Sequence, residues 1–184
     1  MSEHCALIIE NRFDVSKIIE SHAKFIPTNW EIIHLRLDIK SMFDYNKALT
    51  DPDLWNNFRH KKVLIFQHDS MLLRTGIEEF IEWDYVGAPW KFQEHGGNGG
   101  LSWRSRDAMN WCINQKPWDP SLGNEDVYFS NLLKDSPFKL APREVCEKFS
   151  CESIYKEGTL GYHAIEKYLT PEEVIKIKTQ YEQN

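Results

Sequence analysis

Four short clusters of polar residues carry the groups in this chain that could do chemistry. Gln67-His68-Asp69 directly follows the apolar run at 63–66, and Asn124-Glu125-Asp126 contains a pair of acids. The other two clusters are the glycine-rich run at 96–100 and the late sequence Gly161-Tyr162-His163. Open α/β sheets bind ligands at the carboxyl ends of their strands. Polar groups that follow apolar runs are therefore better functional candidates than the same residues inside a helix.

Asp69 has two interpretations on residue chemistry alone. A carboxylate at a strand end can bind Mg²⁺ or Mn²⁺, which prefer oxygen ligands and also take substrate phosphates. Alternatively, Asp69 caps the next turn, as Asp and Ser commonly do. His163 is similarly open: a lone histidine is more often structural, but a neutral imidazole could complete a metal site begun by Asp69.

The glycine run and the acid pair are also open to two interpretations. Glycines at 96, 97, 99 and 100 would let the backbone approach a ligand closely, or would simply form a flexible connection. Glu125 and Asp126 begin an expected helix, where acids favour the helix dipole. One of them could equally act as a general base, which needs a carboxylate within hydrogen-bond reach of an acceptor hydroxyl.

The composition suits one domain covering residues 1–184, with 41% apolar and 27% charged residues. A net charge of −6 argues against a nucleic-acid partner, which would need a basic face. The four cysteines form no C-x-x-C pair, and Cys5 and Cys112 are expected to be reduced core residues. We find neither a signal peptide nor an apolar run long enough to span a membrane. The sequence thus predicts a cytoplasmic protein, or the catalytic core of a longer one.

The elements expected to position these clusters alternate between strands and helices. Apolar runs predict strands at 6–10, 30–35, 63–66 and 101–104, and a segment at 140–149 that begins as a strand. Helical spacing and capping residues predict helices at 15–23, 51–58, 105–113, 127–134 and 171–181. The order strand, helix, strand at the start indicates a βαβ unit. We therefore expect an α/β fold with a mostly parallel central sheet flanked by helices.

The order of the clusters resembles the GT-A glycosyltransferase plan, which combines a D-x-D-type metal motif, a glycine loop, an x-E-D acid pair and a late histidine. The sequence is more similar still to a glycosyltransferase-like family of unknown function. The stretches that carry this resemblance are FQHDS, DYVGAPW, GNGGLSWRS, NEDVYFS and FSCES, followed by a late G-x-H. A fainter similarity links the chain to fringe and the β-1,3-galactosyltransferases. Gln67 stands where the metal motif usually has its first acid, and it brings no charge.

The resemblance implies a GT-A-like single domain with a Rossmann-like nucleotide-binding half, and it assigns a role to each cluster. Asp69 and His163 would bind Mn²⁺ or Mg²⁺ at the diphosphate of the donor, and Asp126 would be the catalytic base. The remaining residues would contact the nucleotide, the donor sugar or the acceptor: Glu10, Arg12, Gln67, His68, Gly97, Asn98, Gly99, Gly100 and Glu125.

The function expected from the sequence is therefore inverting transfer of a sugar from a nucleotide-diphospho-sugar, with UDP as the expected nucleotide, to a glycan or protein acceptor. One alternative is a catalytically silent nucleotide-sugar-binding module with the same fold. Another is a metal-dependent phosphohydrolase that uses Asp69 and Glu125, although the additional Asp and His clusters of two-metal sites are missing.

Overall fold

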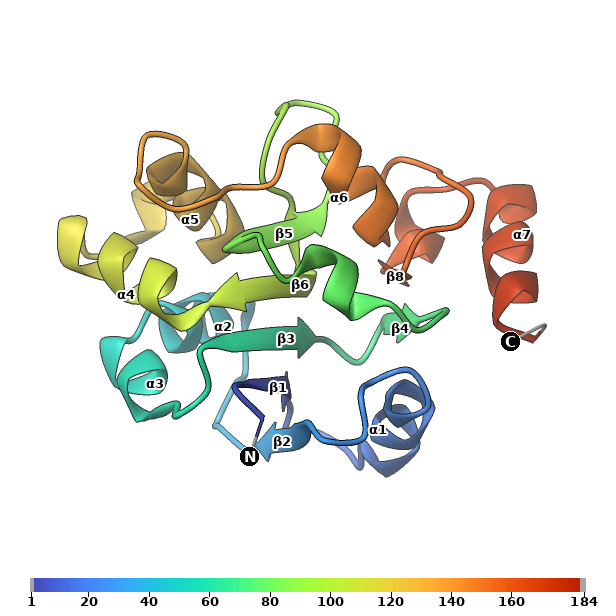
Figure 1. Ribbon diagram of the computed structural model, residues 1–184, viewed down its shortest axis with the longest axis horizontal. Helices are drawn as coiled ribbons and strands as arrows, with labels where there is room; N and C mark the ends of the chain where they lie inside the picture. Colours follow the sequence, from blue (N-terminus) through green and yellow to red (C-terminus); the bar gives the residue numbers. More distant parts are fainter. Residues whose placement is uncertain (1, 183–184) are drawn as a thin grey trace.

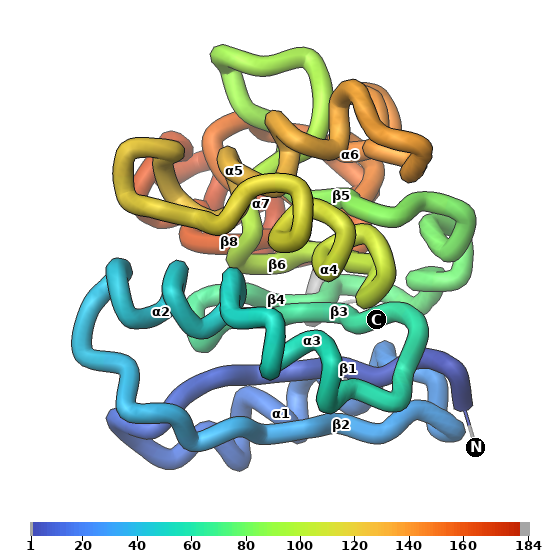
Figure 2. The backbone as a smooth tube through the Cα atoms, turned by 90° about the vertical axis from the view of Figure 1, so that its left-hand side faces the viewer, coloured from blue at the N-terminus to red at the C-terminus, as the bar shows by residue number. Residues whose placement is uncertain are grey.

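The apolar runs form a five-stranded sheet in the computed structural model, which describes residues 2–182. The strand order is β2-β1-β3-β6-β5, and Figure 2 shows the strands stacked in this order from bottom to top. The strands are β1 His4–Ile9, β2 Glu31–Leu35, β3 Lys62–Phe66, β5 Tyr85–Ala88 and β6 Asn98–Ser105. β1 and β3 are buried apart from their first residues, as expected for central strands.

The sheet is mixed, so the prediction of a mostly parallel sheet is wrong. β1 pairs in parallel with β2 and β3, whereas β6 pairs antiparallel with both β3 and β5. The hydrophobic pattern of β6 identifies a strand but carries no information about its direction. Because β6 is antiparallel, its first residues lie beside the end of β3, and Leu101 is in register with Phe66.

Helices cover both faces of the sheet. The α-helices are α1 Ser16–Ala23, α2 Met42–Leu49, α3 Pro52–Asn57, α4 Arg106–Gln115, α5 Glu125–Leu133, α6 Arg143–Phe149 and α7 Pro171–Glu182. Short 3₁₀ turns are η1 Ile77–Phe80, η2 Pro120–Leu122 and η3 Ile165–Lys167. In Figure 1, α3, α4 and α5 lie on the left of the sheet, and α1 and α6 lie on the right.

Alternate residues of each strand build two separate cores. Cys5, Leu7 and Ile9 of β1 pack in the cluster that includes α2, α3, α4 and α5. Ala6 and Ile8 belong to the cluster on the opposite face, with residues of η1 and α6. This alternation follows from the two-residue period of a strand. Cys5 and Cys112 are both free and buried, as predicted.

A second, three-stranded sheet was not anticipated. It has the order β4-β8-β7, formed by β4 Ser70–Leu72, β7 Ser150–Cys151 and β8 Gly161–His163. β8 contains the late sequence Gly161-Tyr162-His163. The segment expected to begin as a strand near residue 140 contains α6 instead. Strands of two or three residues are too short for a periodic signal, and they form here because β4 and β8 pair across a long sequence separation.

Replacing Leu64 by Ala in β3 should lower the free energy of unfolding by about 2–5 kcal/mol. Leu64 is fully buried in the centre of the sheet, so its loss leaves a cavity between packed layers. Ile175→Ala is the matched control: Ile175 is 63% exposed, and its replacement should change stability by no more than about 0.5 kcal/mol. Chemical denaturation of the two variants measures both values, and equal effects would contradict the central position of β3.

Candidate functional site

The ends of β1 and β3 open into a cavity of about 350 Å³. The two strands are parallel neighbours, so the residues that follow them meet at one edge of the sheet. The cavity wall contains residues from both ends and from α2: Glu10, Arg12, Ser41, Met42, Tyr45, Gln67, His68 and Asp69. Five residues that the sequence assigned to the donor site therefore lie together. They are Glu10, Arg12, Gln67, His68 and Asp69.

Glu10 and Arg12 form a hydrogen-bonded polar part of the cavity wall. The buried Glu10 carboxylate accepts hydrogen bonds from the backbone N–H groups of Asn11 and Arg12 and from Nε of Arg12, at 2.8–3.0 Å. The hydrogen bond from the Arg12 side chain is the main reason why the pKa of Glu10 is lowered to about 2. Glu10 therefore stays ionised, and it holds the Arg12 guanidinium beside His68.

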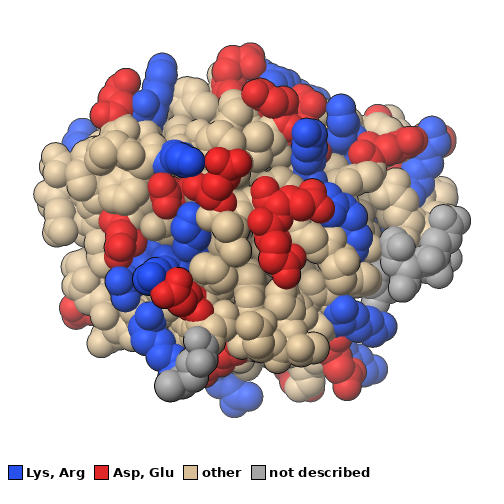
Figure 3. All heavy atoms as spheres, viewed as in Figure 1, with Lys and Arg blue, Asp and Glu red and all other residues tan. Residues whose placement is uncertain are grey.

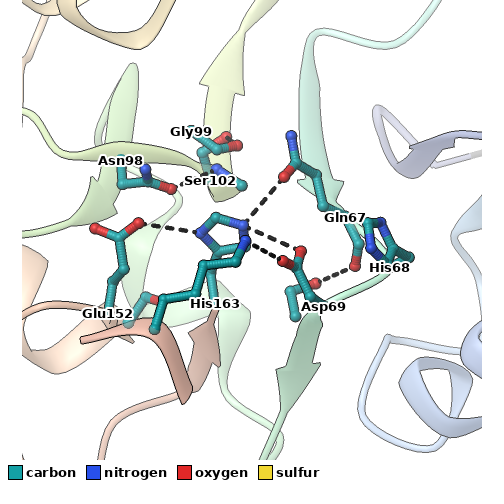
Figure 4. A network of polar contacts seen from close by, with 12 residues as sticks. Gln67, His68, Asp69, Asn98, Gly99, Ser102, Glu152 and His163 are labelled. Carbon is teal, nitrogen blue, oxygen red and sulfur yellow. Dashed lines mark hydrogen bonds and ion pairs between the residues drawn. The ribbon is translucent and has the colours of Figure 1, made fainter. Parts of the chain in front are cut away.

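His163 brings three other polar side chains together at the end of β3. Its Nε2 atom lies 3.2 Å from Asp69 Oδ1 and 3.0 Å from Gln67 Oε1, and its Nδ1 atom lies 3.4 Å from Glu152 Oε1. Figure 4 shows these side chains pointing toward the imidazole ring. The backbone fixes this arrangement, because Ser70 pairs with His163 and the Ala164 N–H donates to the Asp69 carbonyl at 2.9 Å. The predicted proximity of Asp69 and His163 is confirmed.

The charges around Asp69 keep it ionised. Burial raises the pKa of Asp69, but hydrogen bonds and charges from His163 and Lys167 lower it further than burial raises it. Lys167 Nζ lies 2.9 Å from Asp69 Oδ2. Burial lowers the pKa of His163, but the Asp69 and Glu152 carboxylates outweigh it and raise the value to about 8. His163 and Lys167 therefore place two positive charges beside Asp69.

The side chains beside His163 include ligand atoms of the types that a small divalent cation prefers. Gln67 Oε1 and Asp69 Oδ1 both lie beside His163 Nε2, and Asp69 Oδ1 is buried without a hydrogen bond of good geometry. Glu152 would orient the imidazole of His163, as carboxylates commonly do for metal-binding histidines. Within residues 2–182, no three His, Cys, Asp or Glu side chains form a complete metal cluster. Mg²⁺ and Mn²⁺ suit such a site, because substrate phosphates and water supply most of their ligands.

A smaller cavity of about 60 Å³ adjoins the first one. Met42, Tyr45 and Gln67 belong to the walls of both cavities. The other residues of its wall come from α2, β6, α5 and β8: Asn46, Asn98, Gly99, Gly100, Asn124, Glu125, Asp126 and His163. Of the predicted donor or acceptor residues, Gly97 lines neither cavity. Its backbone instead packs against Gly87, and its carbonyl accepts a hydrogen bond from the Tyr85 hydroxyl at 3.0 Å.

Asp126 is a buried carboxylate at the wall of the smaller cavity. Its Oδ2 atom accepts a hydrogen bond from the Gly99 N–H at 3.0 Å, and its Oδ1 atom accepts one from the Val127 N–H at 2.8 Å. Burial, followed by the charge of Glu125, raises the pKa of Asp126 to about 6. A carboxylate with this pKa is mostly ionised at pH 7 and still accepts a proton readily, as a general base requires.

Glu125 is a buried acid in the wall of the smaller cavity, and its charge is paired inside the protein. Both of its carboxylate oxygens bind the Arg104 guanidinium, at 2.5 and 3.0 Å, and both side chains are almost completely buried. Glu125 therefore lines the smaller cavity while its charge is already paired. The phosphohydrolase alternative requires Glu125 to act together with Asp69. The ion pair with Arg104 means that Glu125 is not free to do so.

Glycines 99 and 100 are required by the side chains on either side of them. A Cβ atom on Gly99 would overlap Arg104 and Glu125, and a Cβ atom on Gly100 would overlap the imidazole of His163. The glycine run expected to be a loop is therefore partly the start of β6, which packs between Asp126 and His163. The Gly100 carbonyl accepts a hydrogen bond from the Gln67 N–H at 2.8 Å, which fixes it to the end of β3.

Sequence reasoning missed several residues that complete the site. They are Tyr45, Asn46, Arg104, Glu152 and Lys167. The Asn46 side chain donates to Asn124 Oδ1 at 3.0 Å and accepts from the Glu125 N–H at 3.2 Å, so α2 caps the start of α5. Arg104 and Glu152 belong to GNGGLSWRS and FSCES, two of the stretches that carry the family resemblance. Membership of these stretches is the one sequence feature that could have identified the two residues. Nothing in the local sequence marks the other three.

Another cavity of about 590 Å³ lies between β2, α2 and α3. Its wall is more apolar, and it contains Ile33, Leu35, Leu54 and Phe58. It includes none of the residues that the sequence assigned to chemistry. Its size alone therefore gives no reason to prefer it as the catalytic site.

The fold is shared with solved glycosyltransferases. A glycosyltransferase involved in the glycosylation of the major capsid of PBCV-1 matches 96% of this chain and 98% of its own, with a TM-score of 0.56 and 13% sequence identity. The apo form of the glycosyltransferase GlyE of Streptococcus pneumoniae TIGR4 matches 93% of this chain and 55% of its own, with a TM-score of 0.51 and 12% identity. At these identities the likeness concerns the fold alone.

The family is defined by sequence. A model of the family DUF5672, described as a protein of unknown function, matches residues 29–163, and the chain belongs to this family. No curated protein matches the sequence. The similarity to fringe and the β-1,3-galactosyltransferases stays a prediction.

Two surface properties bear on possible partners. Among the described residues, no helix has the length and apolar character needed to cross a membrane. On the face shown in Figure 3, Lys and Arg are interspersed with Asp and Glu, and the described residues form no continuous basic stripe there.

Replacing Glu125 by Gln should lower the free energy of unfolding by about 3–5 kcal/mol, because Arg104 would remain buried without a counter-charge. The control is Glu79→Gln, which breaks the exposed ion pair between Glu79 and Arg74 and should cost no more than about 1 kcal/mol. Denaturant titrations of the two variants give both values. If Glu125→Gln cost no more than Glu79→Gln, Glu125 would not be held by Arg104.

Proposed function

We propose that this protein is a metal-dependent glycosyltransferase that moves a sugar from a nucleotide-diphospho-sugar, with UDP as the expected nucleotide, to a hydroxyl group of a glycan or protein. The observation that carries the proposal is the pair of adjoining cavities. The larger one contains Asp69 and three cationic side chains suited to phosphates, and the smaller one contains Asp126, whose pKa is raised to about 6. The shared fold with two solved glycosyltransferases supports it.

The larger cavity suits the nucleotide and its diphosphate. Arg12, Lys40 and Lys167 bring positive charge to its wall, and Gln67, Asp69 and His163 are the residues that would hold Mn²⁺ or Mg²⁺. When bound, the metal neutralises the negative charge that develops on the departing diphosphate. Lys167, which pairs with Asp69 here, would then be free to contact a phosphate oxygen.

In the smaller cavity, Asp126 would remove the proton from the acceptor hydroxyl. The acceptor oxygen forms the new bond to the anomeric carbon as the bond from that carbon to the diphosphate oxygen breaks. The bonding electrons leave with the diphosphate, and the proton stays on Asp126. The hydrogen bonds from the Gly99 and Val127 N–H groups fix the carboxylate while it waits for the proton. Attack from the face opposite the leaving group gives inversion.

Asp69→Ala should remove the Mn²⁺-dependent part of UDP binding and leave the fold intact, because Asp69 supplies the one carboxylate directed at the metal position. The Asp69 carbonyl, which holds Ala164, is kept in this variant. Calorimetric titration of UDP with and without Mn²⁺ measures the effect. Asp107→Ala, which removes an exposed acid at the start of α4, is the control and should bind UDP as the wild-type protein does. Unchanged affinity of Asp69→Ala would remove Asp69 from the site.

Asp126→Asn should reduce turnover by about 10²–10⁴-fold while UDP binding is retained, because the amide cannot accept the proton. The wild-type rate should fall as the pH drops below about 6, since the carboxylate with its raised pKa is then protonated and inactive. Release of UDP from a panel of UDP-sugars, with water or glycans as acceptors, measures both effects. A stably folded Asp126→Asn protein with wild-type turnover would exclude Asp126 as the base. Donor binding without any turnover in the wild-type protein would favour the silent binding module.

A further inference from the structure

Two asparagines from different elements line the smaller cavity together with Asp126. Asn98 is the first residue of β6, and Asn124 directly precedes α5. The residue after Asn98 is Gly99, whose N–H donates to Asp126 Oδ2, and Asp126 itself lies two positions after Asn124. Each asparagine is therefore close in sequence to Asp126 or to the backbone group that holds its carboxylate.

The hydrogen bonds of Asn98 fix which end of its amide is free. Its Oδ1 atom accepts from the Gly100 N–H at 2.8 Å. A backbone N–H is always a donor, so the side-chain atom that meets it must be the amide oxygen. The Nδ2 atom makes no hydrogen bond with any of residues 2–182, and it is not one of their buried unpaired atoms. Asn98 therefore brings an accessible N–H donor to the cavity wall.

The orientation of the Asn124 amide follows from its contact with Asn46. Asn46 Oδ1 accepts from the Glu125 N–H at 3.2 Å, so the other end of the Asn46 amide is a donor. This Nδ2 atom meets Asn124 at 3.0 Å, and Asn124 must present its Oδ1 atom there. The Nδ2 atom of Asn124, an exposed residue, is left without a partner in the described part of the chain.

Asn124 also departs from the usual behaviour of its position. An asparagine directly before a helix normally accepts a hydrogen bond from the first turn of that helix. Asn124 makes no such bond, and Asn46 binds the first N–H of α5 from α2 instead. The side chain of Asn124 thus does not serve its own helix, and its amide remains available to a ligand in the cavity.

The groups in this wall suit a sugar better than a peptide. A hydroxyl group can accept from an amide N–H and direct its own proton to a carboxylate or to water. Each peptide unit brings an N–H that needs a fixed acceptor, and the oxygens of Asn98 and Asn124 are already occupied. Met42, which is 59% exposed, adds an apolar surface for the C–H groups of a sugar ring.

We propose that the acceptor is a glycan, and that the Nδ2 atoms of Asn98 and Asn124 donate hydrogen bonds to the hydroxyl groups that flank the reacting hydroxyl at Asp126. This assignment rests on the proposed glycosyltransferase function. The cavity of about 60 Å³ admits a few water-sized groups, so one edge of the acceptor ring enters it. A serine or threonine side chain offers one hydroxyl and leaves both amides unused.

Aspartate substitutions isolate the proposed donors. Asn98→Asp and Asn124→Asp keep the oxygen that accepts from Gly100 or Asn46 and remove the N–H donor. Asn124→Ala removes the same donor without adding a charge. Asn57→Asp is the control, because Asn57 lines the separate cavity between β2, α2 and α3.

Release of UDP would be measured with Mn²⁺ and with UDP-glucose, UDP-galactose or UDP-N-acetylglucosamine as the donor. The acceptors would be the methyl glycosides of glucose, galactose, mannose and N-acetylglucosamine, a blocked serine peptide, and water alone. The KM of the acceptor, the KM of the UDP-sugar and kcat would be determined separately, together with the melting temperature of each variant.

We expect at least one glycoside, and not the peptide, to raise UDP release above the rate with water. Asn98→Asp, Asn124→Asp and Asn124→Ala should each raise the KM of that glycoside by about 3- to 10-fold, the size of one neutral hydrogen bond, and leave the KM of the UDP-sugar unchanged. Asn124→Asp should melt as the wild-type protein does, whereas Asn124→Ala should melt at a lower temperature. Asn57→Asp should change neither KM.

Four results would overturn the assignment. An unchanged glycoside KM in Asn98→Asp and Asn124→Ala would leave both asparagines with structural roles alone. A raised KM of the UDP-sugar in place of the glycoside would put the two amides at the donor. UDP release that no glycoside stimulates, with or without an effect of the peptide, would refute the glycan acceptor and leave the transfer of a sugar standing. No release of UDP with any acceptor or with water would refute the proposed function itself.

Discussion

The candidate site depends on the absence of side chains at two consecutive residues of β6. Gly99 packs against the Arg104–Glu125 ion pair and donates its N–H to Asp126, while Gly100 packs against the His163 imidazole. A methyl group at either position would overlap one of these neighbours. Asp126, the candidate base, and His163, of the candidate metal site, thus lie on either side of one strand segment. The absence of side chains at Gly99 and Gly100 allows both to approach the backbone closely. Because β6 runs antiparallel to β3, this segment also meets Gln67 at the end of β3.

A second layer of contacts holds the acid pair in place. Arg104 reaches from β6 to Glu125 on α5, and Asn46 reaches from α2 to the backbone N–H that begins α5. The Asn124 side chain makes no capping bond to its own helix, so Asn46 performs that task from another helix. Buried ion pairs add little net stability but resist rearrangement, because separating the partners leaves a buried charge. Asp126 is therefore held by a network whose members lie far apart in the sequence.

The sequence predicted the apolar central strands, most helices and the residues that gather at the ends of β1 and β3. These features depend on local periodicity, and on the rule that parallel strands end at one edge of a sheet. It predicted neither the direction of β6 nor the pairing of β4 with β8, since both depend on long-range hydrogen bonds. It also did not predict the ion pair of Glu125, because nothing local shows that Arg104 lies opposite. Tyr45 belongs to α2, a helix that the sequence did not predict. Its position in the walls of two cavities depends on contacts that form only when the chain folds.

The neighbours of the two aspartates at the centre of the site shift the pKa values of these acids in opposite directions. Cationic His163 and Lys167 lower the pKa of Asp69, whereas burial and Glu125 raise the pKa of Asp126 to about 6. A carboxylate that stays ionised beside cations is suited to binding a metal and poorly suited to accepting a proton. A carboxylate whose pKa lies near the ambient pH is suited to accepting a proton and less suited to binding a metal. Such divergent environments commonly separate the roles of paired acids in enzymes. The environments of Asp69 and Asp126 therefore point to different roles for the two acids, independently of any resemblance to other proteins.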